Sequence, residues 1–515
     1  LLRQSLTGEY KKEKKQLTSN YSDMLKELAD LYFLLGDTNT SIACLKIIQQ
    51  NEFLDFVRRR EAPEDYFIQI DETEIERDYE IKIKDFARQQ DYINLSIHSD
   101  TSRKAQYIQA LSQLKLQRDM FLKKYGAKLK LAVKAKKREI KKTTMLSKGE
   151  AEIYLAITKK KLRAYFFTLD NEGNPVKGMI EESIDKLELG SNVLSFHKDK
   201  ALGLEVDRKN EAYLTKNLVN PISDYLKTKN ITKIKIRNDS ELNLLPFSAL
   251  KYKGKYLSEL YTIEKLGIVN DNRIVDRLSK IDMFGASKTI NNNFTALPNV
   301  EDELNAISKL KINRSIKREY YLNTEFNKNN FYNSFSNLVD TIHISTHFRL
   351  IGNIADKSKM LMGDGSTLTL AELSNDLPKY KSNLVVLSAC DTGNLGTTKD
   401  GVSSVGLSRI FQDRGAKYVL SSLWKISDKG SADFMTLFYS LLFNNDIKPP
   451  EALRLTQNAF SIGSIDALPE NIILLKDNYL NKVISNMNKK FLIQPNKKIT
   501  YQNPYFWAAF QIDSI

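Results

Sequence analysis

The chain has 515 residues, more than one hydrophobic core usually organises, so we expect two or three domains. Apolar residues make up 42% of it and aromatic residues 10%, which excludes a disordered chain. Its 78 Lys and Arg residues against 63 Asp and Glu leave a net charge of +15, which raises the question of an anionic partner. Two cysteines, Cys44 and Cys390, exclude a disulfide framework and a Cys-rich zinc or iron–sulfur site, so neither a metal nor a cofactor is expected. Histidine-dependent chemistry is limited to four side chains, His98, His197, His343 and His347.

No targeting or membrane-spanning segment is predicted. Residues 1–20 are polar and charged and lack the apolar core of a signal peptide. The apolar runs are short and interrupted by Lys, Asn or Ser, well below the roughly 18 residues that a membrane helix needs. We therefore expect a cytoplasmic protein that makes no membrane contact and keeps its thiols reduced.

Residues 1–142 have the periodicity of helices and contain few Gly and Pro residues. One apolar stripe lies within residues 25–35 and a second within residues 42–48, with a turn at Gly36 between them. This pattern predicts two short helices in a hairpin, which buries its apolar faces only by stacking on neighbouring helices. Cys44 lies on the second stripe and is expected in the core.

The hairpin resembles one tetratricopeptide repeat (TPR) in the spacing of an aromatic, a glycine, a small and a large residue, namely Tyr32, Gly36, Ser41 and Leu45. An ordinary helical hairpin is the alternative. Repeats of this kind are binding surfaces rather than catalysts. The resemblance therefore implies a region that recruits a substrate or a regulatory protein partner.

The segment Lys115–Lys142 carries much of the excess positive charge, which only Asp119 and Glu139 interrupt. Apolar residues such as Leu114 and Leu129 recur along it, so a helix with a charged outer face is predicted. Such a helix could bind the phosphates of a nucleic acid. The alternative is the solvated face of a connecting helix, and no aromatic stacking platform accompanies the charge.

From about residue 146 onwards, short β-rich runs alternate with helices. Strands are predicted at Ala151–Ile157, Leu162–Thr168, Ile231–Arg237, Ile281–Ala286, Thr341–Ser345, Leu384–Ser388 and Tyr418–Leu423. Helices are predicted at Val300–Leu310, Leu370–Leu377, Ser403–Arg414 and Ser431–Phe443. The alternation predicts an α/β fold with a mainly parallel sheet and helices on both faces, in which functional residues collect beyond the carboxyl ends of the strands.

Two of these predicted strands end in residues that can do chemistry. His347 follows the strand Thr341–Ser345, and Cys390 lies on a turn after the apolar strand Leu384–Ser388. If the two strands are parallel neighbours, both ends open on the same edge of the sheet, where an imidazole can take the proton of a thiol. A His that precedes a Cys by roughly 40–50 residues is also the order expected of caspase-like proteases.

Seven motifs follow one another in a recognisable order: LPFSAL (245–250), LPNVEDE (297–303), HISTH (343–347), LSACDTG (387–393), GAKYV (415–419), SLWKISD (422–428) and NPYFWAAF (503–510). With these motifs the span 146–515 resembles the CHAT domain, the caspase- and separase-related peptidase domain that is often fused to tetratricopeptide repeats. The resemblance implies an N-terminal part at 146–280 and a catalytic part at 281–515, preceded by the helical region 1–142.

The resemblance also implies the roles of the site residues. Cys390 would be the nucleophile and His347 its partner base and acid. The oxyanion would be stabilised by the backbone N–H groups of Cys390 and Phe348. Caspase-like enzymes commonly have Gly directly after the catalytic His, and Phe348 departs from that pattern at the second oxyanion donor.

The remaining histidines are expected to be structural. His343 shares strand parity with His347 and is expected to pack or to form a hydrogen bond. His98 and His197 stand in polar surroundings and are expected at the surface.

An acidic residue near the site predicts the specificity. Separases have a segment of the form Leu-Trp-x-x-x-Asp whose acidic residue faces the pocket for the residue before the cleaved bond (P1), and Leu423–Asp428 is similar to it. The resemblance implies that Asp428 would pair with a P1 Arg or Lys, with Asp391 as a second candidate. The alternative is that Asp428 caps the helix that follows it.

We therefore expect a cysteine endopeptidase that cleaves a specific protein partner, and the resemblance makes a role in bacterial defence or cell death reasonable. The alternative is an adaptor that responds to nucleic acid or to a partner through its basic helix and keeps a catalytically silent caspase fold. The presence of both Cys390 and His347 favours the enzyme.

Overall fold

The computed structural model describes residues 25–34, 37, 40–47, single positions between 82 and 96, 103–135, and 146–514 apart from gaps at 159, 268–277, 289–293, 337–338, 350–357, 389–401 and 495–496. The described residues before residue 146 belong to one compact unit, and those from residue 146 onwards belong to a second. In this described part of the chain, no helix is both long enough and apolar enough to cross a membrane.

The first unit is helical where it is described. Residues 25–34 and 40–47 form two helices, and the second begins where the side chain of Asp37 accepts a hydrogen bond from the backbone N–H of Thr40 (3.1 Å). The hydroxyl of Ser41 donates to the carbonyl oxygen of Ala29 (2.7 Å), which ties the two helices together. Cys44 is fully buried, so its predicted place in the core is confirmed. That this hairpin is a tetratricopeptide repeat remains a prediction.

Helix α5 (Lys104–Ala135) contains the first part of the predicted basic helix. The rest of that run, from Lys136 to Lys142, lies outside the described residues. Nucleic-acid binding by the run Lys115–Lys142 therefore remains a prediction from the sequence.

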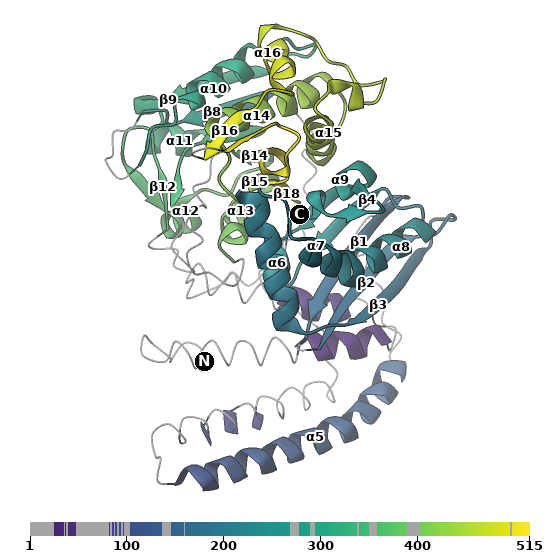
Figure 1. Cartoon of the computed structure of the whole chain (residues 1–515). Helices are drawn as coiled ribbons and strands as arrows, with labels where there is room; N and C mark the ends of the chain where they lie inside the picture. Colours follow the sequence, from purple (N-terminus) through teal and green to yellow (C-terminus); the bar gives the residue numbers. More distant parts are fainter. Residues whose placement is uncertain are drawn as a thin grey trace. The chain divides into compact units, whose positions relative to one another are not determined.

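Eleven strands of the described residues form one sheet in the second unit (Figure 1). Their order across the sheet is β3 (Pro175–Ser183), β2 (Lys161–Leu169), β1 (Glu150–Ile157), β4 (Lys233–Arg237), β7 (Thr262–Leu266), β18 (Phe510–Ser514), β15 (Ala416–Ser422), β14 (Ser382–Leu387), β10 (Thr341–Ser345), β8 (Lys280–Gly285) and β9 (Lys317–Leu322). Smaller sheets pair β5 (Lys251–Tyr252) with β6 (Lys255–Tyr256), β12 (Lys359–Leu361) with β11 (Phe348–Arg349) and β13 (Thr367–Thr369), and β16 (Phe491–Gln494) with β17 (Lys497–Ile499).

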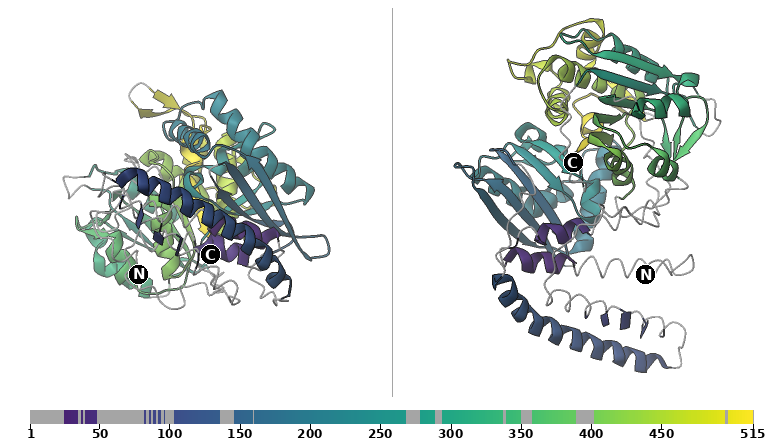
Figure 2. Two further views of the ribbon diagram at one scale, coloured as in Figure 1. Left: turned by 90° about the horizontal axis from the view of Figure 1, so that it is seen from below. Right: turned by 180° about the vertical axis from the view of Figure 1, so that it is seen from behind.

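The helices of this unit are α6 (Lys186–Ala201), α7 (Arg208–Leu214), α8 (Asn220–Thr228), α9 (Leu257–Leu260), α10 (Asn299–Lys309), α11 (Lys328–Ser336), α12 (Leu370–Asp376), α13 (Val402–Arg414), α14 (Asp428–Asn444), α15 (Pro449–Ile462), α16 (Asn478–Asn486) and α17 (Pro504–Trp507). Short 3₁₀ turns lie at Ser240–Leu244, Phe247–Ala249, Asn323–Glu325 and Ile465–Ala467, and a π-helical turn at Thr215–Val219 continues α7 into α8. The β16–β17 hairpin lies beside the end of α6, where Gly203 faces Ile493 and Ile499 (Figure 2).

Alternation along the strands gives the sheet two apolar faces, and helices cover both. On the half that contains β10 and β14, Met283 of β8 faces the helix α10 and belongs to one apolar cluster with Leu304 of that helix. The next residue, Phe284, points to the opposite face, where its ring contacts Phe331 of α11 at 5.4 Å between ring centroids. The mainly parallel sheet with helices on both faces confirms the predicted α/β class.

The C-terminal strand β18 lies in the middle of the sheet. It pairs antiparallel with β15, with Ile512 opposite Leu420, and parallel with β7, with Asp513 opposite Lys265. The strands before residue 270 and those after residue 280 are therefore joined into one continuous sheet by the last residues of the chain.

This central position predicts a large loss of stability for Phe510→Ala. The ring of Phe510 is 1% exposed and stacks on Phe434 at 4.2 Å, so removing it leaves a cavity between β18 and α14. We expect the free energy of unfolding of the second unit to fall by about 3–5 kcal/mol. Urea denaturation followed by tryptophan fluorescence measures it, because both tryptophans of the chain, Trp424 and Trp507, lie in this unit.

The control is Tyr320→Ala on the edge strand β9. This side chain is 40% exposed, so its removal is expected to cost less than about 1 kcal/mol. Equal losses in the two variants would contradict the central role of β18.

Candidate active site

The two strands with chemistry at their ends are parallel neighbours, which is the condition under which both ends open on the same edge of the sheet. Strand β10 pairs with β14 in register from Thr341 opposite Leu384 to Ile344 opposite Leu387. His347 lies three residues beyond Ile344, where the chain leaves the sheet. The imidazole is thus carried on the edge of the sheet at which both strands end.

Cys390 and Asp391 lie outside the described residues. The last described residue before them is Ser388, which directly follows β14 and is 3% exposed. Their predicted roles therefore remain predictions.

His347 is held in one orientation by two contacts. Its Nε2 lies 2.7 Å from the carbonyl oxygen of Thr295, and its ring stacks on Phe294 with 5.4 Å between centroids and 28° between planes. Because a carbonyl oxygen only accepts hydrogen bonds, Nε2 carries the proton and donates it. In the neutral imidazole, Nδ1 is then the nitrogen with the free lone pair.

The backbone around His347 is also fixed. Its carbonyl oxygen accepts from the N–H of Leu361 in β12 (2.9 Å), and the hydroxyl of Thr346 donates to the carbonyl oxygen of Leu361 (2.8 Å). In an antiparallel pair, hydrogen-bonded and non-bonded positions alternate. Phe348, which faces Met360, therefore occupies a non-bonded position, and its N–H points away from β12.

The loop that supplies Thr295 was not identified from the sequence. Leu297 N–H donates to the carbonyl oxygen of Ser287 (3.0 Å), which closes the loop at its base. The side chain of Asn323 accepts from the N–H groups of Ser287 (3.0 Å) and Lys288 (3.1 Å). Asn323 has a positive φ of 51°, a conformation that Asn tolerates better than most residues. No local sequence pattern indicates that this loop meets His347, because the contact spans 52 positions.

Asp428 lies at the start of α14 and faces the start of α10. Its Oδ2 accepts two hydrogen bonds from Asn299, one from the backbone N–H (2.7 Å) and one from the side-chain amide (3.0 Å). The cap of α14 is Ser427, whose hydroxyl accepts from the N–H of Gly430 (3.2 Å), so the alternative interpretation of Asp428 as the helix cap is wrong.

The pKa of the Asp428 carboxyl is shifted by burial and by neighbouring residues of the candidate site. Burial raises the pKa of this carboxyl, the hydrogen bonds from Asn299 oppose that rise, and nearby Glu303 adds to it. His347 also lies within electrostatic range and lowers the pKa. The structure thus brings Asp428 and His347 into one neighbourhood.

The other histidines are both buried where they are described. His343 is completely buried, with Nε2 3.0 Å from Glu303 Oε1 and Nδ1 3.1 Å from the hydroxyl of Tyr439. The prediction that His197 lies at the surface is wrong, because it is 5% exposed and its Nδ1 lies 2.8 Å from the carbonyl oxygen of Leu244. Burial lowers the pKa of His197. His98 lies outside the described residues.

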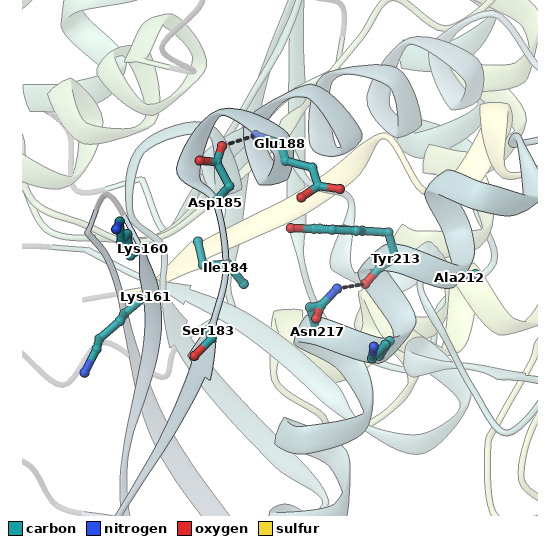
Figure 3. A pocket seen from close by; sticks show the side chains of 10 residues that line it. Lys160, Lys161, Ser183, Ile184, Asp185, Glu188, Ala212, Tyr213 and Asn217 are labelled. Atoms are coloured by element: carbon teal, nitrogen blue, oxygen red, sulfur yellow. Dashed lines mark hydrogen bonds between the residues drawn. The ribbon is translucent and has the colours of Figure 1, made fainter.

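A cavity of about 800 Å³ lies elsewhere in the second unit (Figure 3). It is lined by residues at the start of β2, the end of β3 and helices α6 and α7 with the π-turn, including Lys160, Asp185, Tyr213 and Asn217. None of the candidate site residues that the structure describes, His347, Phe348 and Asp428, lines it. Among the described residues, no group of three or more His, Cys, Asp or Glu side chains is arranged to hold a metal ion.

The family model of the CHAT domain matches residues 210–514. The chain belongs to the CHAT domain family. The match begins within α7 and includes β4, β7 and every later strand of the large sheet. His347, Phe348, Cys390, Asp391 and Asp428 all lie within the matched part of the CHAT domain.

The solved structures that are similar to the chain include two of gingipain and one of separase. The complex of the pro- and mature domains of RgpB from Porphyromonas gingivalis has 9% identity over 64% of this chain and 76% of that one, with a TM-score of 0.34. Separase from Saccharomyces cerevisiae, in complex with securin, has 8% identity over 71% of this chain and 30% of that one, with a TM-score of 0.41. The Arg-specific cysteine proteinase gingipain R has 9% identity over 64% and 74%, with a TM-score of 0.32.

The chain spans less than a third of the separase chain. No curated protein matches the sequence.

Proposed function

We propose that this CHAT domain is a cysteine endopeptidase in which Cys390 is the nucleophile and His347 the base and acid. One observation carries the proposal. Strands β10 and β14 are parallel neighbours whose last paired residues are Ile344 and Leu387, and His347 and Cys390 each follow by three positions. Membership of the CHAT domain family supports the same pair.

The geometry of His347 suits this role. Because Nε2 donates to Thr295, Nδ1 is left to take the proton of the Cys390 thiol. The thiolate attacks the scissile carbonyl carbon, and a C–S bond forms as the carbonyl becomes an oxyanion. His347 then gives its proton to the leaving amine as the C–N bond breaks. Water attacks the acyl-enzyme after His347 removes its proton, and the C–S bond breaks to regenerate the thiol. The carbonyl of Thr295 stabilises the imidazolium formed in each half of the cycle.

In this mechanism, the backbone N–H groups of Cys390 and Phe348 bind the oxyanion that forms from the scissile carbonyl. The non-bonded position of Phe348 opposite Met360 supports its part, since the N–H points away from β12. Phe348 is fully buried, so its aromatic side chain packs inside the domain, although caspase-like enzymes commonly have Gly at this position.

We propose further that Asp428 selects a basic P1 residue, with Asp391 as a second candidate. The partly buried carboxyl of Asp428, within electrostatic range of His347, supports this. A P1 Arg or Lys would form a charge-assisted hydrogen bond with it. The substrate would be a protein that the helical region before residue 146 recruits, or a regulatory partner would bind there, in a bacterial defence or cell-death setting.

A peptide library tests the activity without knowledge of the natural substrate. The full chain and Cys390→Ala are each incubated with peptides derived from a whole proteome, and new amino termini are labelled and identified by mass spectrometry. We expect new termini only with the wild type, and with Arg or Lys before the cut. Equal sets of new termini from both proteins would remove Cys390 from the mechanism.

A further inference from the structure

Ser388, the last described residue before Cys390, is held by all of its polar atoms. Its N–H donates to the carbonyl oxygen of Ile344 (3.0 Å), and its own carbonyl oxygen accepts from the hydroxyl of Ser431 (2.9 Å). Its hydroxyl donates to Oε1 of Glu303 and lies 3.1 Å from the Ser431 hydroxyl. The end of β14 is therefore tied to β10, α10 and α14 at once.

Glu303 is the centre of this arrangement. Its side chain is 1% exposed and reaches from α10 to the ends of both strands. Besides Ser388, it contacts His343 through Oε1 (3.0 Å) and accepts from the hydroxyl of Ser345 through Oε2 (3.4 Å). All of these partners are buried.

Stability does not explain a carboxyl at this position. Its neighbours along the buried face of α10, Val300, Leu304 and Ile307, are apolar and completely buried. Burying a carboxyl costs free energy that its hydrogen bonds only partly return, and a well-packed apolar side chain usually serves a core as well or better. A buried polar group with several specific partners instead fixes one geometry.

We infer that Glu303 is a positioning residue, which with Ser431 holds Ser388 so that Cys390 meets His347 in reactive geometry. The inference rests on the proposed function and deepens it. Only one residue separates Ser388 from Cys390, so the backbone at Ser388 sets where the thiol can lie. Reactive groups must be held within about 0.5 Å of their productive positions, and an error of about 1 Å can cost roughly 100-fold in rate.

Alkylation of Cys390 tests the inference without a substrate. The full chain is treated with iodoacetamide from pH 5 to 9, and the modified Cys390 peptide is quantified by mass spectrometry, separately from buried Cys44. In the wild type, His347 is expected to lower the pKa of the thiol below the ordinary value of about 8.5. In Ser388→Ala and in Glu303→Gln, we expect the alkylation rate at pH 6.5 to fall about 10-fold. Ser388→Thr keeps the hydroxyl and should restore most of the rate.

The matched control is Ser334→Ala. Ser334 is also a buried serine whose hydroxyl donates to a buried carboxylate, that of Asp282 (2.6 Å), but it lies on α11 away from the strand ends. We expect its alkylation profile to match the wild type within about twofold. If Ser388→Ala does not fold, as judged by tryptophan fluorescence, the nearly isosteric Glu303→Gln decides the question.

Alkylation of a His347→Gln variant distinguishes a failure of the proposed function from a failure of the positioning role alone. A profile that His347→Gln leaves unchanged would remove the dyad and with it the proposed function. If His347→Gln changes the alkylation profile of Cys390 but Glu303→Gln keeps the wild-type rate, the positioning role alone is overturned. With a peptide that the wild type cleaves, we expect Glu303→Gln to lower kcat about 10- to 100-fold and to change KM less than about threefold. Equal kcat values in Glu303→Gln and the wild type would overturn the positioning role.

Discussion

Replacing His347 with Gln is expected to lower kcat/KM for peptide cleavage about 10²- to 10⁴-fold, the range that a positioned acid–base group supplies. Gln cannot take the thiol proton or return it to the leaving amine. Replacing Cys390 with Ala is expected to abolish turnover, because no nucleophile remains to form the acyl-enzyme. Steady-state kinetics on a peptide from the library measures both variants.

His197→Gln provides a matched control for the histidine. His197 is also buried, and one of its ring nitrogens lies 2.8 Å from a backbone carbonyl, but it is on α6 rather than at the end of β10. We expect this variant to keep kcat/KM within about threefold of the wild type, even if it unfolds at a lower temperature. A His347→Gln variant that retained wild-type kcat/KM would remove the imidazole from the mechanism.

The second large effect is expected at Asp428. Asp428→Asn keeps the shape of the side chain but removes its charge, so a P1 Arg or Lys loses a charge-assisted hydrogen bond worth about 1.5–3 kcal/mol. We expect kcat/KM for peptides with P1 Arg or Lys to fall about 10- to 100-fold, while peptides with an uncharged P1 change little. A panel of fluorogenic peptides that differ only at P1 measures the ratio.

The preference for a basic P1 should also depend on pH. Only the ionised carboxylate attracts a cation, and burial raises the pKa of Asp428 above that of an ordinary aspartate. The ratio of P1 Arg to uncharged P1 cleavage is therefore expected to fall as the pH drops through this raised pKa, at a higher pH than for an exposed Asp. In Asp428→Asn the ratio should not vary over the same range.

Asp302→Asn controls for a general change of charge. Asp302 lies on α10 directly before Glu303. Its side chain is 65% exposed, so its charge is screened by solvent. We expect the P1 ratio to be unchanged in this variant. If the wild type and Asp428→Asn both prefer an uncharged P1 residue to the same degree, Asp428 does not select a basic P1 residue.

The strands that the sequence predicted are those whose pattern is strong locally. The buried run Leu384–Ser388 and the segment Thr341–Ser345 have apolar residues bounded by turns, and both are strands of the sheet interior. The edge strand β3 was missed because it is partly exposed on both faces and carries Pro175 and Gly178. The strand β18 was not predicted, because the family motif at 503–510 reaches only its first residue, Phe510, and the sequence gives no sign that this strand lies between β7 and β15.

The error at His197 has a clear cause. Its neighbours Lys198 and Asp199 are polar, which made a surface position look natural. However, Leu189, Val193 and Phe196 form a stripe at helical spacing, and His197 continues it. Helical periodicity, rather than the polarity of adjacent residues, was the signal that placed this side chain inside.

By itself the sequence determined the class of the second unit, the strands β10 and β14, and the two residues, His347 and Cys390, whose chemistry makes them candidates. It could do so because hydrophobic periodicity and residue type are local properties. Only the tertiary structure decided that β10 and β14 are neighbours, that Thr295 faces His347, that Asn299 faces Asp428, and that Glu303 reaches Ser388. These contacts join residues from 43 to 129 positions apart in the sequence. Their partners are chosen by burial and hydrogen bonding across the whole sheet, which no short segment of the sequence contains.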